Sequence, residues 1–156
     1  MNIQYFGTTA EFHLLKYHDK LARRPHDCGI DLFPSGIQTC DTCGYGRLYT
    51  INTGFYIILS PGYYGRLVER SSTIQKLPGA RVIPGTIDAG YDGELLIRVF
   101  SESSLTLTDI QKCIARREAI AQVIPTVCGE FHLVPRPLET RGSSGFGSTD
   151  HLKANG

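Results

Sequence analysis

The 156-residue sequence has no hydrophobic run that approaches the ~18 residues needed to cross a bilayer. Its first residues do not lead into a basic segment followed by an apolar one, so we expect an intracellular protein, cytoplasmic or nuclear. It also has no excess of one charge, with 16 Lys and Arg against 15 Asp and Glu. A net charge of +1 provides no basic surface for a long nucleic acid, so we expect a small anionic ligand.

The sequence lacks the even set of cysteines that a disulfide scaffold needs. Five cysteines without a secretory signal indicate reduced thiols. Cys40 and Cys43 form one Cys-x-x-Cys pair without a second pair, which is weak evidence for zinc. We interpret Cys28, Cys113 and Cys128 as small buried hydrophobic side chains.

The composition is that of a globular protein with many turns. Hydrophobic residues make up 41%, and there are 17 Gly and 8 Pro, which favours short elements joined by turns. There is no internal repeat. Residues 141–156 are rich in Gly and Ser, so we expect one folded domain over residues 1–140 and a flexible arm over residues 141–156.

Short runs of β-branched and aromatic residues, bounded by Gly, Pro, Ser or Asp, predict strands. These strands are expected at residues 49–59 (with a break near Gly54), 66–69, 85–88, 94–101, 105–107, 119–126 and 131–134. Regular short strands indicate an all-β barrel or sandwich. The apolar run at residues 95–100 predicts a strand covered on both faces, or on one face by another subunit.

Helical signals are sparse. Residues 72–76 are a mild helix candidate. Residues 112–121 are a weaker one, because residues 120–124 fit a strand that ends at Pro125.

Two clusters carry residues suited to a polyphosphate ligand. Arg70-Ser71-Ser72 offers a guanidinium group, two hydroxyls and successive backbone N–H groups, although such a triplet is more often a surface turn. In residues 85–94, Asp88 follows an apolar strand and is a candidate general base, and the ring of Tyr91 is a candidate pocket wall. The alternative for that cluster is an ordinary hairpin turn.

A third cluster lies in the arm, at residues 141–149. Its glycines allow backbone N–H groups to approach an anion, while Arg141 suits a phosphate and Phe146 suits stacking on a base. No Gly-Lys-Ser/Thr follows, so it is not a Walker loop. The alternative is a disordered tail.

Together the clusters resemble the conserved motifs of the homotrimeric deoxyuridine triphosphatases, the dUTP diphosphatase family. Residues 28–32, 61–72, 85–94, 120–124 and 141–149 resemble its five motifs in order, over most of the chain. The fourth motif departs from the family. There a basic residue, Gly, an acid and Arg precede Ile-Ala-Gln, whereas this chain has Arg116-Arg117-Glu118-Ala119. We expect Arg116 or Arg117 to compensate for the missing arginine.

The resemblance implies a distorted jelly-roll β-barrel, a homotrimer with exchanged C-terminal arms, and hydrolysis of dUTP to dUMP and pyrophosphate. Mg2+ would be held by the triphosphate and water, with Asp31 as possible indirect support. Asp88 would activate the water that attacks the α-phosphate. The implied substrate-binding residues are Arg70, Ser71, Ser72, Gln122 and Arg141 for the phosphates, Gly85, Thr86, Ile87 and Leu96 for uracil, Tyr91 for deoxyribose, and Phe146 and Gly147 for closure of the arm.

Two alternatives stay open at this stage. The related dCTP deaminases carry their catalytic Glu five residues after the hairpin glycine. Counting from Gly93 reaches Arg98, so deamination is disfavoured. The other alternative is a non-catalytic binding module that retains the fold, against which Asp88, Tyr91 and the arm argue.

Overall fold

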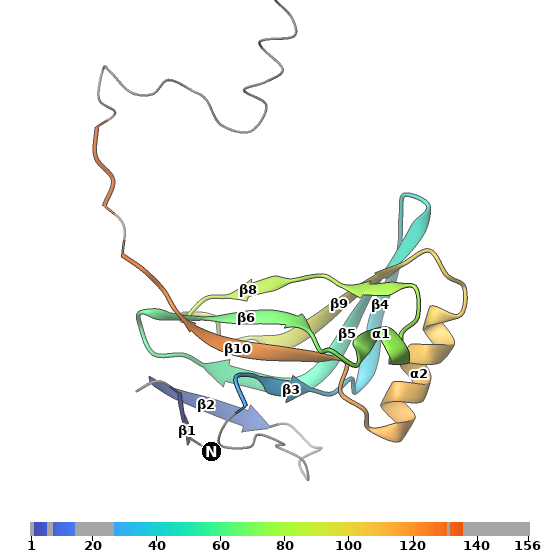
Figure 1. Ribbon diagram of the computed structural model, residues 1–156, viewed down its shortest axis with the longest axis horizontal. Coiled ribbons are helices and arrows are strands. Elements are labelled where there is room, and N and C mark those ends of the chain that lie inside the picture. Colours follow the sequence, from blue (N-terminus) through green and yellow to red (C-terminus); the bar gives the residue numbers. More distant parts are fainter. Residues whose placement is uncertain (1, 6–7, 15–26, 131, 136–156) are drawn as a thin grey trace, which may run out of the picture.

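The computed structural model describes residues 2–5, 8–14, 27–130 and 132–135. These residues form β-strands and two short helices (Figure 1). The strands are β1 (Asn2–Tyr5), β2 (Thr8–Leu14), β3 (Ile30–Leu32), β4 (Gly36–Cys43), β5 (Gly46–Ile58), β6 (Tyr63–Glu69), β7 (Ala80–Val82), β8 (Gly85–Ile87), β9 (Glu94–Ser101) and β10 (Ala121–Val127). The helices are α1 (Thr73–Lys76) and α2 (Thr106–Arg116). In the described part of the chain, neither helix is long and apolar enough to cross a membrane.

The strands form two antiparallel sheets. The first has the order β1-β2-β5-β9-β7, with β4 also paired to β5, and the second has the order β3-β10-β6-β8. Strands adjacent in sequence often lie in different sheets, as β5 and β6 do. Such crossings are typical of jelly-roll folds, and the predicted all-β class is confirmed.

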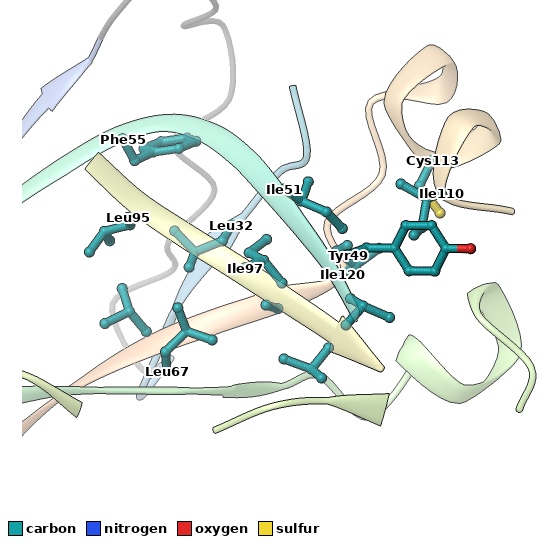
Figure 2. Packing of buried hydrophobic residues seen from close by; sticks show 14 of the residues in the cluster. Leu32, Tyr49, Ile51, Phe55, Leu67, Leu95, Ile97, Ile110, Cys113 and Ile120 are labelled. Carbon is teal, nitrogen blue, oxygen red and sulfur yellow. The ribbon is translucent and has the colours of Figure 1, made fainter. Parts of the chain in front are cut away.

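The hydrophobic core lies between the facing sides of the two sheets (Figure 2). Along β9, Leu95, Ile97 and Val99 are fully buried, because successive side chains of a strand point to opposite faces. Leu32 of β3 and Leu67 of β6 join the same cluster from the second sheet.

The outward side of β9 is not buried within the chain. It carries Leu96, which is half-buried, and Arg98, which is exposed. The prediction that the strand over residues 95–100 is covered on both faces is therefore wrong for the described chain. The alternative, that another subunit covers its outward face, stays a prediction.

The irregularity predicted near Gly54 is present in the long strand β5, although the strand does not end there. Gly54 has a positive φ of 70°, and the register with β9 shifts between Asn52 and Tyr56. The strand therefore bulges there and continues to Ile58.

Helix α2 replaces the strand predicted at residues 105–107 and covers the first half of the helix candidate at residues 112–121, ending at Arg116. That strand prediction is wrong because Thr106, Ile110 and Cys113 are spaced four and three apart, so all three lie buried on one helix face. The predicted helix near residues 72–76 is confirmed as α1. The strand predicted at 131–134 is wrong for the described residues 132–134, which pair with no strand.

The cysteines are free thiols. Cys113 is buried as expected, but the burial predicted for Cys28 and Cys128 is wrong, because both lie exposed just outside the ends of strands. Cys40 and Cys43 are exposed on β4. Their spacing of three places them on opposite faces of the strand. Among the described residues, no group of three or more His, Cys, Asp or Glu side chains is arranged to hold a metal.

Candidate functional site

A pocket of about 250 Å³ lies between β8, the turn that follows it, and the outward side of β9. We call it the hairpin pocket. It contains six residues singled out from the sequence: Gly85, Thr86, Ile87, Asp88, Tyr91 and Leu96. Glu94 and Arg98 of β9 also line it. Strand β8 is the edge of its sheet, because it pairs only with β6 among the described strands. The outward backbone groups of β8 are therefore free of ladder partners in this part of the chain.

Two contacts and one glycine fix the wall formed by Tyr91. Its backbone N–H donates to the carbonyl of Asp88 over 3.0 Å, and its hydroxyl donates to the carbonyl of Glu94 over 2.7 Å. The ring lies over Gly93, where an added Cβ would meet the Tyr91 Oη at 2.5 Å and Cζ at 2.7 Å. Gly93 therefore sets the position of the ring. Sequence reasoning assigned Gly93 no such role.

The carboxylate of Glu94, which lines this pocket, accepts hydrogen bonds from the bulge of β5. Its Oε1 accepts the backbone N–H groups of Thr53 at 2.9 Å and Gly54 at 2.7 Å, and its Oε2 accepts from Asn52 Nδ2 at 3.1 Å. These two N–H groups lie where the ladder to β9 is interrupted. Glu94 thus satisfies donors that the bulge would leave unpaired. In the sequence, the only sign of the contact between Glu94 and the β5 bulge is that an acidic residue follows the hairpin.

A second pocket, of about 310 Å³, gathers Asp27, Asp31, Arg70, Ser71 and Gln122. We call it the Arg70 pocket. Three neighbouring strands bring these residues together, because β10 pairs with both β3 and β6. Ser72 does not line this pocket. Instead its carbonyl accepts from the backbone N–H groups of Gln75 and Lys76 in α1.

Asp31 and Arg70 form an ion pair in this pocket, with 2.8 Å between Oδ1 and Nε. Burial raises the pKa of Asp31, Arg70 opposes that rise, and Asp27 adds to it, so that the pKa stays above its ordinary value. The contact uses only Nε of Arg70. The terminal nitrogens of the guanidinium group are not engaged by it.

Gln122 is held against the backbone of the neighbouring strands. Its Nε2 donates to the carbonyl of Glu69 over 3.2 Å, and β10 pairs it with Asp31. A Cβ at Gly29 would collide with Gln122 Oε1. Gly29 therefore leaves the space that the amide occupies.

The comparison with protein families now decides the kind of protein. The family model described as dUTPase matches residues 16–150. The chain belongs to the dUTPase family.

Individual dUTPases are similar to the chain in sequence and in structure. A deoxyuridine 5'-triphosphate nucleotidohydrolase of Leifsonia xyli is 34% identical over 132 residues, which are 81% of this chain and 82% of that protein. The protein of that name from Rhodococcus erythropolis is 31% identical over 80% of this chain and 74% of its own. The solved structure of a Staphylococcus bacteriophage 80alpha dUTPase variant with dUpNHpp has a TM-score of 0.59 and 22% identity, covering 90% of this chain and 98% of that one. At that identity the likeness shows the shared fold.

The fourth dUTPase motif, which this chain alters, has a left-handed residue at the position of the motif's glycine. Arg117 stands where the resemblance places glycine, and its φ of 53° and ψ of 50° are left-handed. Ala119 replaces the motif's arginine and is buried. Lys76 of α1 donates to the Ala119 carbonyl over 2.8 Å. Compensation by Arg116 or Arg117 stays a prediction, since both are exposed at the end of α2.

The two pockets do not merge within one chain of this dUTPase. Ile87 of β8 lies opposite Gly65 of β6, and Arg70 follows Gly65 by five residues. At ~3.3 Å per residue that is about 16 Å along the strand, and Asp88 lies one residue further in the opposite direction. Arg141, Phe146 and Gly147 lie outside the described residues.

Proposed function

We propose that the chain hydrolyses dUTP to dUMP and pyrophosphate. The observation that carries the proposal is the carboxylate of Asp88 beside Tyr91 in a pocket bounded by an edge strand, in a chain of the dUTPase family. The relatives named as deoxyuridine triphosphate nucleotidohydrolases, and the phage dUTPase solved with dUpNHpp, support the choice of substrate.

Asp88 acts as the general base. It takes a proton from a water molecule, and the water oxygen forms a bond to the α-phosphorus. The bond from that phosphorus to the oxygen bridging the β-phosphate breaks, and pyrophosphate leaves. The turn closed by the Tyr91 N–H holds Asp88 in place, which reduces the entropy lost on reaching the transition state.

The hairpin pocket selects the base and the sugar. The outward backbone groups of Gly85, Thr86 and Ile87 have the spacing of a strand and pair with the donor and acceptor groups of uracil, while Leu96 packs against its face. The ring of Tyr91 packs against the deoxyribose and leaves no room for a 2′-hydroxyl. Because the ring is held by Gly93 and Glu94, it does not yield easily to the larger sugar.

The Arg70 pocket binds the triphosphate. Arg70, Ser71 and Gln122 offer donors to phosphate oxygens. Ser72 lies outside the pocket at the start of α1, and its hydroxyl is a further donor once the triphosphate is bound. The residues present fit Mg2+ held by the triphosphate oxygens and water, because Mg2+ keeps several of its waters and the carboxylate of Asp31 lies in this pocket, where it would accept hydrogen bonds from them. Bound there, Mg2+ would offset the charge that develops on the leaving pyrophosphate.

A homotrimer completes the site. One chain holds Asp88 too far from Arg70 for both to reach one α-phosphate, so a second copy must supply one of the two pockets. Val127 is exposed at the end of β10, and beyond it the chain leaves the body of the molecule (Figure 1) with Leu133 and Val134 exposed by 94% and 74%. These side chains suit a neighbouring copy. The arm over residues 141–156 then follows the domain over residues 1–140 and closes the site, with Arg141 on the outer phosphate and Phe146 and Gly147 over the base.

We also propose the metabolic role that follows from the reaction. Removal of dUTP limits uracil incorporation into DNA, and the product dUMP is the precursor of dTMP. This role places the chain in the cytoplasm or nucleus, and the free thiols of its cysteines support a reducing compartment.

Pyrophosphate release on dUTP, dCTP, dTTP and UTP, measured side by side, tests the proposal. We expect turnover of dUTP alone. Asp88→Asn should abolish release while it largely retains nucleotide binding, because the amide keeps the shape of the carboxylate and loses its basicity. Wild-type turnover in Asp88→Asn would disprove the assignment of the base. Release from dCTP at the rate of dUTP would disprove the pocket.

A further inference from the structure

Arg98 is the one cation in the hairpin pocket as described, and the reaction above gives it no role. It lies on β9 with Glu94 and Leu96, at alternate positions that face the pocket. Among the described residues no carboxylate pairs with its guanidinium group. The nearby Glu94 is already engaged by Asn52, Thr53 and Gly54. Arg98 therefore has its donors available for a ligand.

Arg98 lies at the end of the pocket away from the sugar wall. Its carbonyl accepts the backbone N–H of Ile83 over 2.8 Å, which places it beside the start of β8. Tyr91 donates a hydrogen bond to the carbonyl of Glu94, and Glu94 lies four residues, or about 13 Å, before Arg98 along β9. Leu96 lies between the two ends. A deoxynucleoside with its sugar against Tyr91 thus extends its base over Leu96 toward Arg98.

We propose that Arg98 donates a hydrogen bond to the carbonyl oxygen at position 4 of the base and so adds to the discrimination of uracil from cytosine that the β8 backbone provides. The inference rests on the proposed function. A guanidinium group has five N–H donors, no acceptor, and a charge that persists at any ordinary pH. Uracil presents a carbonyl acceptor at that position, whereas cytosine presents an amino donor. Thymine presents the same carbonyl as uracil, so Arg98 contributes nothing against thymine, which the narrow hairpin itself must exclude.

Two variants and a control test this assignment. Arg98→Met keeps the apolar stem of the side chain but removes its donors, and Arg98→Gln replaces the guanidinium group with an amide that both donates and accepts. Arg81→Met removes an arginine from the neighbouring strand β7, where the side chain is 72% exposed and outside the pocket. All three should give the circular dichroism spectrum and oligomer size of the wild type.

We expect kcat/KM for dUTP to fall at least 10-fold in Arg98→Met, mainly through KM. Activity on dCTP should not fall, so the preference for dUTP over dCTP drops at least 10-fold while the preference over dTTP is unchanged. Arg98→Gln should retain more activity than Arg98→Met on both nucleotides, because its amide can pair with either base, and Arg81→Met should leave both ratios as they are. Equal losses on dUTP and dCTP would overturn the proposal, because they would mean that Arg98 binds the phosphates or stabilises the sheet and does not contact the base.

Binding of deoxyuridine and deoxycytidine, which carry no phosphate, separates this inference from the proposed reaction. The wild type should prefer deoxyuridine by ligand-observed NMR, and Arg98→Met should lose most of that preference. If the wild type releases no pyrophosphate from dUTP, the proposed function fails, but loss of the nucleoside preference in the variant still supports contact with the base. A deoxyuridine affinity unchanged in Arg98→Met overturns the contact whatever the activity.

Discussion

Replacement of Arg117 by glycine should stabilise the fold. Arg117 ends α2 with φ 53° and ψ 50°, and its N–H donates to the carbonyls of Cys113 and Ile114. A left-handed residue with a Cβ costs roughly 1–2 kcal/mol, whereas glycine adopts that conformation without strain. The greater backbone entropy that glycine loses on folding returns about 0.5–1 kcal/mol of this gain. The exposed Arg117 side chain has little packing to lose. The free energy of unfolding should therefore rise by about 0.5–1 kcal/mol.

The neighbouring Arg116 provides a matched control. It is the last residue of α2, and glycine in a helix costs about 1 kcal/mol relative to good helix formers. Both variants remove one exposed positive charge near the C-terminal end of the helix, so they share any loss of interaction with the helix dipole. Arg117→Gly and Arg116→Gly should consequently differ by about 1.5–2 kcal/mol, with opposite signs relative to the wild type.

Urea denaturation followed by circular dichroism, at one fixed protein concentration, measures this difference. The concentration must be fixed because association of copies adds to apparent stability. The midpoint should move up for Arg117→Gly and down for Arg116→Gly with unchanged slopes. Equal destabilisation of both variants would refute the reasoning, because it would mean that the left-handed conformation at Arg117 carries no cost that glycine relieves.

Three further predictions follow from single contacts. Gly93→Ala should push the Tyr91 ring out of place, because the added Cβ would collide with it. The preference for dUTP over UTP in pyrophosphate release should then fall several-fold, with little change in the unfolding midpoint. An unchanged preference would contradict the role of Gly93. Glu94→Ala leaves two N–H groups of the β5 bulge without their acceptor. At ~1–3 kcal/mol for each unsatisfied group, the free energy of unfolding measured in urea should fall by about 2–6 kcal/mol, and Glu94→Gln should lose less. Because the folded protein raises the pKa of Asp31, the stability that this carboxyl contributes is present below its ordinary pKa and is lost as pH rises through the folded pKa. Arg70→Met removes the opposing charge and should raise that pKa further, so that the Asp31 carboxyl titrates at higher pH by NMR. An unchanged titration would contradict the ion pair.

The strands were predictable where alternation of side chains and turn residues agree. The bounds of β9 match the prediction, since buried and outward residues alternate from Glu94 to Ser101. Helix α2 was not predictable from short apolar runs, because Leu105 and Leu107 are 68% and 39% exposed while the buried face is set by Thr106, Ile110 and Cys113. Which residues of such a segment are buried depends on tertiary packing against the sheets, and local propensity does not specify that.

The residues of the candidate site were predictable one at a time, but their arrangement was not. Asp88 and Arg70 are recognisable because each follows a strand and carries a charge. Their separation depends on the pairing of β8 with β6, in which Gly65 lies opposite Ile87. The contacts of Glu94 depend likewise on a register shift 40 residues earlier in the chain. Register is a property of the folded sheets, and a list of motifs in sequence order does not contain it.

The edge position of β8 connects base recognition with assembly. An unpaired strand edge invites association with other chains, so proteins keep such edges short, as β8 is at three residues between Pro84 and Asp88. If β8 paired with another strand, its outward N–H and carbonyl groups would be satisfied and could not distinguish one base from another. A pocket that reads a base through this backbone must therefore keep an open edge next to the general base. The proposed phosphate donors lie beyond the other end of β6, where Arg70 follows Glu69. In one chain the open edge and these donors are therefore too far apart to serve one nucleotide. In the proposed trimer, a second copy would bring its own Arg70 pocket to the open edge without any change in the fold.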